Sequence, residues 1–215
     1  MRVLLADDRQ MMREGLRALL EKHQQTEVVG EAEDGRAAVA LAAELKPDVV
    51  IMDVTMPGLN GIEATKQILR DHPRTKVLAL SVHADRRYAL TMLEAGAVGY
   101  LVKNSAAQEL YRALEAVNKG QTYLSPDVAQ VLVDSYRKRQ FPTDKAASEA
   151  LTDREREVLQ LLAEGMTSKQ IALQLHLSVA TVDTHRRQIM NKLNLHGIAE
   201  LTKYAIREGL TGIDP

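Results

Sequence analysis

The chain of 215 residues is 45% hydrophobic and 27% charged, which is the composition of a folded globular protein with room for one large domain or two small ones. It has no cysteine, which excludes a disulfide framework, thiolate metal ligands and a thiol nucleophile, and its net charge of −1 supplies no overall basic field for nucleic acid. No apolar run approaches the ~18 residues of a membrane span or forms a signal-peptide core, so we expect a cytoplasmic protein without a membrane partner.

The first half of the chain alternates short aliphatic runs with longer stretches that carry apolar residues at helical spacing. This alternation favours a parallel sheet with helices on both faces, because the crossover between parallel strands is right-handed and usually helical. We therefore predict a doubly wound α/β domain over residues 1–120. The expected strands are 2–6, 27–32, 48–52, 76–81 and 99–103, and the expected helices are 11–23, 35–45, 61–71, 85–95 and 106–119.

The second half of the chain has helical patterns only. Residues 121–150 are predicted to be a connecting segment, with an appended helix that begins at Ser125-Pro126 and a linker over 140–150, where periodicity is lost. Residues 151–215 are predicted to form a small all-α domain. Its four expected helices are 152–165, 167–175, 178–193 and 198–208, the first two with capping-box spacing at their starts and the first with Gly165 at its end.

Charged and hydroxyl side chains follow four of the five expected strands: Asp7 and Asp8, then Asp53, Ser81 and Lys103. The crevice of a doubly wound sheet lies at the carboxyl ends of its strands, so the order 2-1-3-4-5 would bring the three aspartates together. A hard cation such as Mg²⁺ would relieve their repulsion, and Lys103 and Ser81 could hold an incoming phosphoryl group. Each residue alone could be an ordinary strand-end residue, but the set of five favours a functional site.

These residues stand in motifs that resemble a response-regulator receiver domain: ADD at 6–8, DVTMPGLNGIEA at 53–64, LALS at 78–81 and GYLVK at 99–103. The resemblance covers residues 1 to about 120. It implies a flavodoxin-like (βα)5 fold with strand order 2-1-3-4-5, and phosphoryl transfer from a sensor histidine kinase. The roles it implies are Asp53 as phospho-acceptor, Asp7, Asp8, Asp53 and the Thr55 carbonyl as Mg²⁺ ligands, Lys103 as the phosphate-binding lysine, and Ser81 and Tyr100 as the switching pair.

Four positions bear on the match to the family and on rival kinds of site. Asn104 stands after Lys103 where many receivers have proline, so the peptide between them could be cis or trans. His83 matches a position that tunes dephosphorylation, although a plain surface histidine would give the same pattern. A haloacid-dehalogenase-like phosphatase would need a second aspartate where Thr55 stands, and a flavin site would need a phosphate-binding loop where Asp7 stands. We expect no turnover enzyme.

The helical tail contains a possible helix-turn-helix, because the loop 175–178 has the length of its turn. One face of the helix 178–193 is polar and could either read bases or be solvated. Counted from Leu151, eight Lys or Arg balance eight Asp or Glu, so charge gives little support for DNA binding. The polar residues of that face are Asp183, Thr184, Arg187, Gln188 and Asn191.

The segment LTDREREVLQLLAEGMTSKQIALQLHLSVATVDTHRRQIMNKLNL (151–195), continued to about Gly209, is similar to the LuxR-type helix-turn-helix of NarL/FixJ-type response regulators. The resemblance implies double-stranded promoter DNA as a partner and the helix 198–208 as a dimerisation element. Asp183 departs from the usual lysine, and its carboxylate predicts altered specificity and weaker nonspecific binding. The implied contacts are Asp183, Thr184 and Arg187 to bases and Lys169, His185 and Arg186 to the DNA backbone.

Together these features predict a two-component response regulator that is phosphorylated on Asp53, forms a homodimer and binds promoter half-sites about one helical turn, ~10 bp, apart. One rival is a constitutive DNA-binding regulator whose receiver serves only as a scaffold. Another is a phosphoryl sink whose tail only dimerises. The complete acidic set with Lys103 argues against the first rival, and the cations Lys169 and Arg186 argue against the second.

Overall fold

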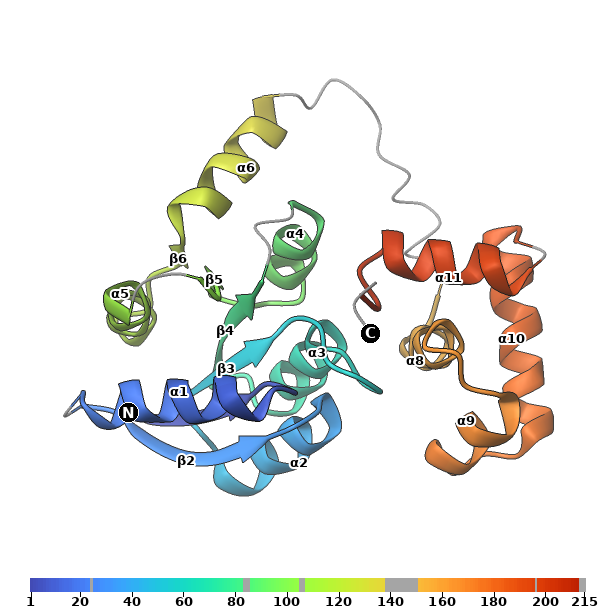
Figure 1. The fold of residues 1–215 in the computed structure, drawn as a ribbon, viewed down its shortest axis with the longest axis horizontal. Helices are drawn as coiled ribbons and strands as arrows, with labels where there is room; N and C mark the ends of the chain where they lie inside the picture. The colour runs from blue at the N-terminus through green and yellow to red at the C-terminus, as the bar shows by residue number, and fades with distance from the viewer. Residues whose placement is uncertain (24, 83–85, 105–106, 138–150, 196, 213–215) are drawn as a thin grey trace. The chain divides into compact units, whose positions relative to one another are not determined.

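The computed structural model describes residues 1–23, 25–82, 86–104, 107–137, 151–195 and 197–212. The chain forms two compact units, Met1–Arg139 and Gln140–Pro215 (Figure 1). The predicted linker 140–150 lies outside the described residues. In the part of the chain that is described, no helix is both long and apolar enough to cross a bilayer.

The first unit is built on a six-stranded parallel sheet of order β2-β1-β3-β4-β5-β6. This confirms the predicted fold class and the order 2-1-3-4-5. A sixth strand was not predicted, because two residues are too few to display a periodicity. The strands are β1 (Arg2–Ala6), β2 (Glu27–Ala32), β3 (Val49–Asp53), β4 (Lys76–Ser81), β5 (Gly99–Val102) and β6 (Tyr123–Leu124).

Helices cover both faces of this sheet (Figure 1). Alternate residues of a strand point to opposite faces, so in β1 Val3 and Leu5 belong to one apolar cluster while Leu4 and Ala6 belong to the other. The Val3 cluster includes residues of α1 and α5, and the Leu4 cluster includes residues of α2, α3 and α4. These helices are α1 (Gln10–Glu21), α2 (Gly35–Leu45), α3 (Gly61–Asp71), α4 (Arg86–Glu94) and α5 (Ala107–Asn118).

The appended helix α6 (Pro126–Arg137) is part of the same core. Its Val128 is fully buried in the cluster that contains Tyr100, and Leu124 and Leu132 pack against that cluster. The Ser125 amide donates to the Tyr100 carbonyl over 3.0 Å, which continues the pairing of β6 with β5. The chain after β5 is therefore anchored to the α/β unit rather than being a free connection.

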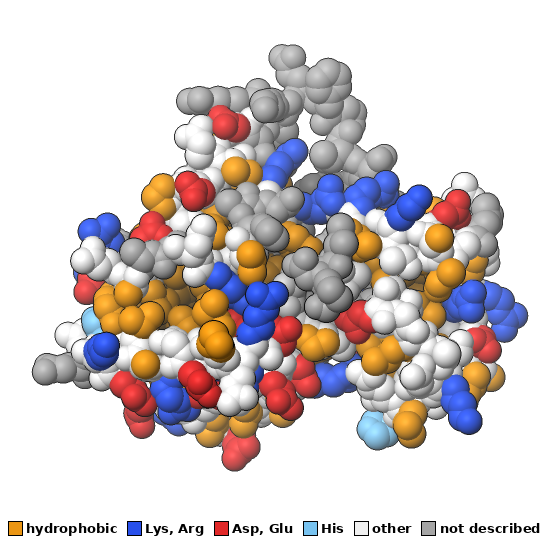
Figure 2. All heavy atoms as spheres, viewed as in Figure 1, with side chains coloured by type: hydrophobic (Ala, Val, Ile, Leu, Met, Phe, Trp, Pro, Cys, Tyr) orange, Lys and Arg blue, Asp and Glu red, His pale blue; other side chains and the backbone are white. Residues whose placement is uncertain are grey.

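Within residues 151–195 and 197–212, the second unit has four short helices around its own apolar cluster. Thr152 and Thr167 each close a capping box, and Gly165 has a φ of +86°, a left-handed conformation that glycine adopts without strain. Side chains of both charge signs occur on this unit in the view of Figure 2, as its balanced composition requires. The helices are α8 (Asp153–Ala163), α9 (Ser168–Gln174), α10 (Val179–Leu193) and α11 (Ile198–Arg207).

Candidate functional sites

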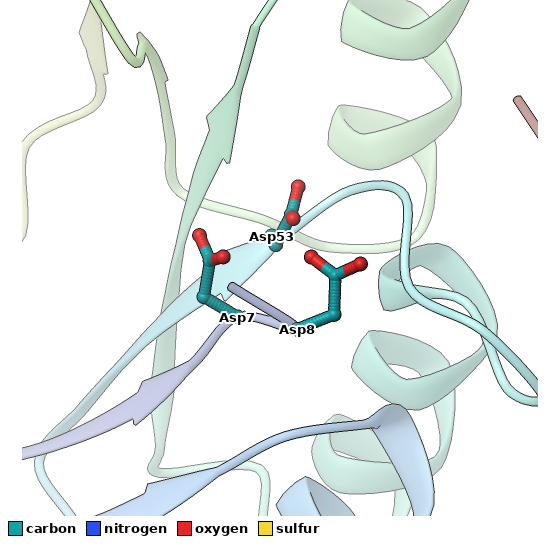
Figure 3. Close-up of side chains that lie close together, drawn as sticks. All are labelled: Asp7, Asp8 and Asp53. Carbon is teal, nitrogen blue, oxygen red and sulfur yellow. The ribbon is translucent and has the colours of Figure 1, made fainter. Parts of the chain in front are cut away.

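Three carboxylates meet at the carboxyl ends of β1 and β3 (Figure 3). These strands are neighbours in register, with Ala6 opposite Met52, so the residues that follow or end them must lie close together. Asp7, Asp8 and Asp53 each offer a carboxylate oxygen, and these oxygens all lie within 4.8 Å of one another. Asp7 and Asp53 are buried and Asp8 is exposed.

The ammonium group of Lys103 faces this cluster from the end of β5. Its Nζ lies 2.7 Å from Asp53 Oδ2 and 2.6 Å from Asp7 Oδ2, and the lysine side chain is only 5% exposed. Burial raises the pKa of Asp53 to about 6, with a further contribution from the charge of Asp7, although Lys103 opposes the rise. At neutral pH most Asp53 side chains are therefore ionised and carry the lone pairs that a nucleophile needs.

Backbone amides hold the carboxylates in place, and an arginine side chain holds the main chain beside them. The Thr55 amide donates to Asp53 Oδ1 over 3.2 Å, and the Arg9 amide donates to Asp7 Oδ1 over 2.9 Å. Arg13, which sequence reasoning missed, donates to the Asp7 carbonyl over 2.7 Å and pairs with Glu31 over 3.2 Å. An arginine in the first turn of the helix that follows the strand-end aspartates is the signal that could have found it.

The loop between β3 and α3 passes very close to the candidate acceptor. A Cβ atom on Gly61 would lie 1.9 Å from the carbonyl oxygen of Asp53, so this position admits only glycine. Gly58 has a φ of +76°, and Asn60 caps α3 by accepting from the Glu63 amide. The tight course of this loop is the reason for both glycines.

Ser81 and Tyr100, the predicted switching pair, lie on adjacent strands. Ser81 is 3% exposed at the end of β4, where its carbonyl accepts from the Lys103 amide, and Tyr100 is fully buried in β5. The peptide between Lys103 and Asn104 is trans, since the described residues contain no cis peptide bond. His83 lies outside the described residues.

The donor set of the acidic cluster fits a hard divalent cation. Carboxylate oxygens are the ligands that Mg²⁺ accepts, together with backbone carbonyls and water. Asp7, Asp8 and Asp53 supply three carboxylates, and Thr55 brings a backbone carbonyl into the loop directly after Asp53. The site therefore has the ligand chemistry of a magnesium centre, with Lys103 as a fixed cation beside it.

The second unit places α9 and α10 around a short turn. Ser178 begins α10 by accepting from the Thr181 amide, and His176 in the turn has a φ of +53°. The outer face of α10 carries the polar residues expected there. Thr184, Arg187, Gln188 and Asn191 are exposed, Asp183, His185 and Arg186 are half-buried, and Lys169 is exposed on α9.

Polar contacts hold α10 against the other helices of its unit. The Lys192 ammonium lies 2.7 Å from Glu155 Oε2 in the capping box of α8. Burial works against ionisation of Glu155, but hydrogen bonds from Lys192 and Thr152 outweigh it and keep the pKa of Glu155 below its ordinary value. On the opposite side Ser168 Oγ donates to Asp183 Oδ1 over 2.7 Å. Sequence reasoning missed both contacts, because each joins residues far apart in the chain.

An acidic crevice with a facing lysine on a sheet of this order is what a receiver domain presents, and the helix-turn-helix in the same chain makes this class that of a transcriptional response regulator. Comparison with known families agrees over both units. The family described as response regulator receiver domain matches residues 3–115, and that described as bacterial regulatory proteins, luxR family, matches residues 149–205.

Relatives of similar length support the same assignment. The chain is 43% identical to the transcriptional regulatory protein LiaR of Bacillus subtilis (strain 168), over 97% of this chain and 98% of LiaR. It is 40% identical to the response regulator UvrY of Escherichia coli (strain K12), over 97% and 94% of the two chains. A solved complex of the response regulator RcsB with DNA aligns with a TM-score of 0.61 and 30% identity, over 97% and 98%. The chain belongs to the NarL/FixJ-type response regulators.

Proposed function

We propose that Asp53 accepts a phosphoryl group from the phosphohistidine of a sensor kinase. The observation that carries this proposal is the buried Asp53 carboxylate, 2.7 Å from Lys103 and grouped with Asp7 and Asp8. An Asp53 oxygen attacks phosphorus, the P–N bond to the kinase imidazole breaks, and an aspartyl phosphate forms while the imidazole takes a proton. Because such transition states are loose, positioning and charge neutralisation do most of the catalysis.

The cation that the site fits is Mg²⁺, with Asp7, Asp8, Asp53 and the Thr55 carbonyl as its ligands. When bound, it neutralises charge on the transferring phosphoryl oxygens. Lys103 is placed to shift from the two carboxylates to a phosphoryl oxygen, since its Nζ already lies within 3 Å of both. Ser81 is proposed to donate its hydroxyl to the phosphoryl group, and Tyr100 to respond on the neighbouring strand.

The tail is proposed to deliver the output. Phosphorylation promotes a homodimer, and two helix-turn-helix units bind half-sites of promoter DNA through Thr184 and Arg187, with Lys169, His185 and Arg186 on the phosphates. The functional divisions are a receiver at 1–120, a helix and linker at 121–150 and a DNA-binding domain at 151–215. A protein with this partner works in the cytoplasm and regulates transcription rather than turning over a substrate.

Intact mass after incubation with Mg²⁺ and acetyl phosphate tests the central step. The wild type is expected to gain one phosphoryl group that requires Mg²⁺, and Asp53→Ala is expected to gain none. Asp71→Ala removes an exposed aspartate of α3 and should retain the adduct. An adduct that persists in Asp53→Ala, or that is missing from rapidly quenched wild-type samples, would overturn the assignment.

One observation favours the rival of a constitutive regulator. Tyr100 is fully buried, which is the position that the switch would give it after phosphorylation. DNA affinity decides between the two functions. A phosphorylation-driven regulator binds duplex DNA more tightly after acetyl phosphate treatment. A constitutive regulator binds duplex DNA with the same affinity before and after treatment, and its Asp53→Ala variant binds with that affinity too.

A further inference from the structure

The feature that carries a further inference is the hydrogen bond between the first residue of α9 and the recognition helix α10. Ser168 Oγ donates to Asp183 Oδ1 over 2.7 Å, a length typical of a hydrogen bond to a charged acceptor. Both side chains are half-buried where the two helices meet. The Asp183 carboxylate is therefore held toward α9 by a specific donor.

This bond places the carboxylate at the edge of the polar face of α10. Successive residues of a helix are rotated by about 100°, so a side chain aimed at α9 points away from the direction of Thr184. Thr184 and Arg187 are exposed, in contrast to the half-buried Asp183. Arg187 Nε also donates to the Asp183 backbone carbonyl over 3.3 Å, so the arginine lies over the same turn of the helix.

A carboxylate in this position has an electrostatic effect on DNA binding even if it touches no base. The phosphates that border a groove lie beside the flanks of a recognition helix, and neutralising them with Lys and Arg supplies most of the nonspecific affinity. Asp183 stands between Lys169 and Arg187 along the chain. Its fixed negative charge cancels about as much attraction to the phosphates as one Lys or Arg supplies. The unit as a whole has no surplus of basic residues to compensate.

We propose that Asp183 is a positioning residue that fixes α9 against α10 through Ser168 and weakens the DNA affinity of each tail without reading a base. This inference rests on the proposed DNA-binding function and deepens it. If a single tail binds DNA weakly, the promoter is occupied only when two tails bind it together. The charge of Asp183 therefore makes DNA binding more dependent on dimerisation. It replaces the expectation that Asp183 selects a base.

The test compares full-length variants on two probes, a random-sequence 30-bp duplex and a randomised duplex pool from which bound sequences are selected. Asp183→Asn keeps an acceptor for Ser168 but removes the charge. Its affinity for the random duplex should rise, and the slope of log affinity against log salt concentration should steepen by about 0.9. The ratio of its affinity to that of wild type should therefore be about eightfold larger at 0.1 M than at 1 M salt. Glu44→Gln removes an exposed charge from the receiver helix α2 and should leave the slope unchanged.

The selected sequences and a second substitution complete the test. Asp183→Asn should select the same motif as wild type, and Ser168→Ala should lower affinity several-fold in the wild-type background but not in Asp183→Ala, where the bond is already missing. A changed base preference in Asp183→Asn, an unchanged salt slope, or equal effects of Ser168→Ala in both backgrounds would overturn the inference. If wild type binds neither probe, the proposed DNA-binding function itself fails, which is a different outcome.

Discussion

Replacing Asp53 with asparagine should stabilise the protein at neutral pH in the absence of divalent cations. The side chain is 2% exposed, and burial raises its pKa from 3.8 to about 6. A group whose pKa is raised on folding favours the folded state while it is protonated, and that contribution is lost as the pH rises from about 4 through 6. A shift of about two pKa units corresponds to about 3 kcal/mol, which is the gain expected for Asp53→Asn above pH 7.

Urea unfolding with EDTA, followed by tyrosine fluorescence, measures this difference, because five of the six tyrosines lie in residues 1–139. The free energy of unfolding of Asp53→Asn should exceed that of wild type by about 3 kcal/mol at pH 7.5, and the gap should close toward pH 3.5. Added Mg²⁺ should narrow the gap at pH 7.5 by binding wild type more tightly. Equal stabilities at pH 7.5 would refute the view that burial dominates the ionisation of Asp53.

Three further substitutions test other contacts. Lys103→Met removes the cation beside Asp53 and should slow phosphorylation by acetyl phosphate by at least ~100-fold, as followed by intact mass; a rate within threefold of wild type would contradict the role of the lysine. Gly61→Ala should lower the free energy of unfolding in urea by about 3 kcal/mol or more, because its Cβ would lie 1.9 Å from the Asp53 carbonyl oxygen. An unchanged midpoint would mean that the loop can move to accommodate the methyl group without loss of stability. Wild type should lose part of the tail's stability as the pH falls below the ordinary glutamate pKa of 4.5, since the pKa of Glu155 is held below that value, and Glu155→Gln should remove this loss. Thermal unfolding from pH 3 to 7 measures the difference, and parallel profiles would contradict the pairing with Lys192.

The order of the first five strands was predictable because each of them carries its own signal in the sequence. Runs buried on both faces are continuously apolar, as in VVIM at 49–52, and the helices between them show helical spacing. The strand order then brings the aspartates at the strand ends together at the carboxyl edge of the sheet. The strand β6 was not predictable, because Tyr123 and Leu124 pair with β5 through contacts made only in the folded chain.

The site was predictable in its members but not in its connections. Asp53 and Lys103 could be placed at one edge from strand ends alone, yet their 2.7 Å contact and the resulting pKa of Asp53 depend on side-chain packing. Arg13 and Ser168 were missed because their partners, the Asp7 carbonyl and Asp183, come from other elements. Asp183 illustrates the limit, since the sequence gives its place in the motif but not the hydrogen bond that joins it to Ser168 of α9.

The anchoring of α6 to the receiver core shortens the connection between the two units. The chain from Arg137 to Leu151 spans at most about 50 Å when fully extended. The chain from residue 120 to Leu151 would span about 110 Å, so the packing of α6 halves the reach of the connection. If two receivers pair as proposed, each tail is confined to a small volume that it shares with the other tail. A sphere with a radius of about 50 Å holds one molecule at about millimolar concentration. If α11 is the dimerisation element that the family resemblance implies, a dissociation constant near millimolar between two α11 helices would be enough to pair the tails.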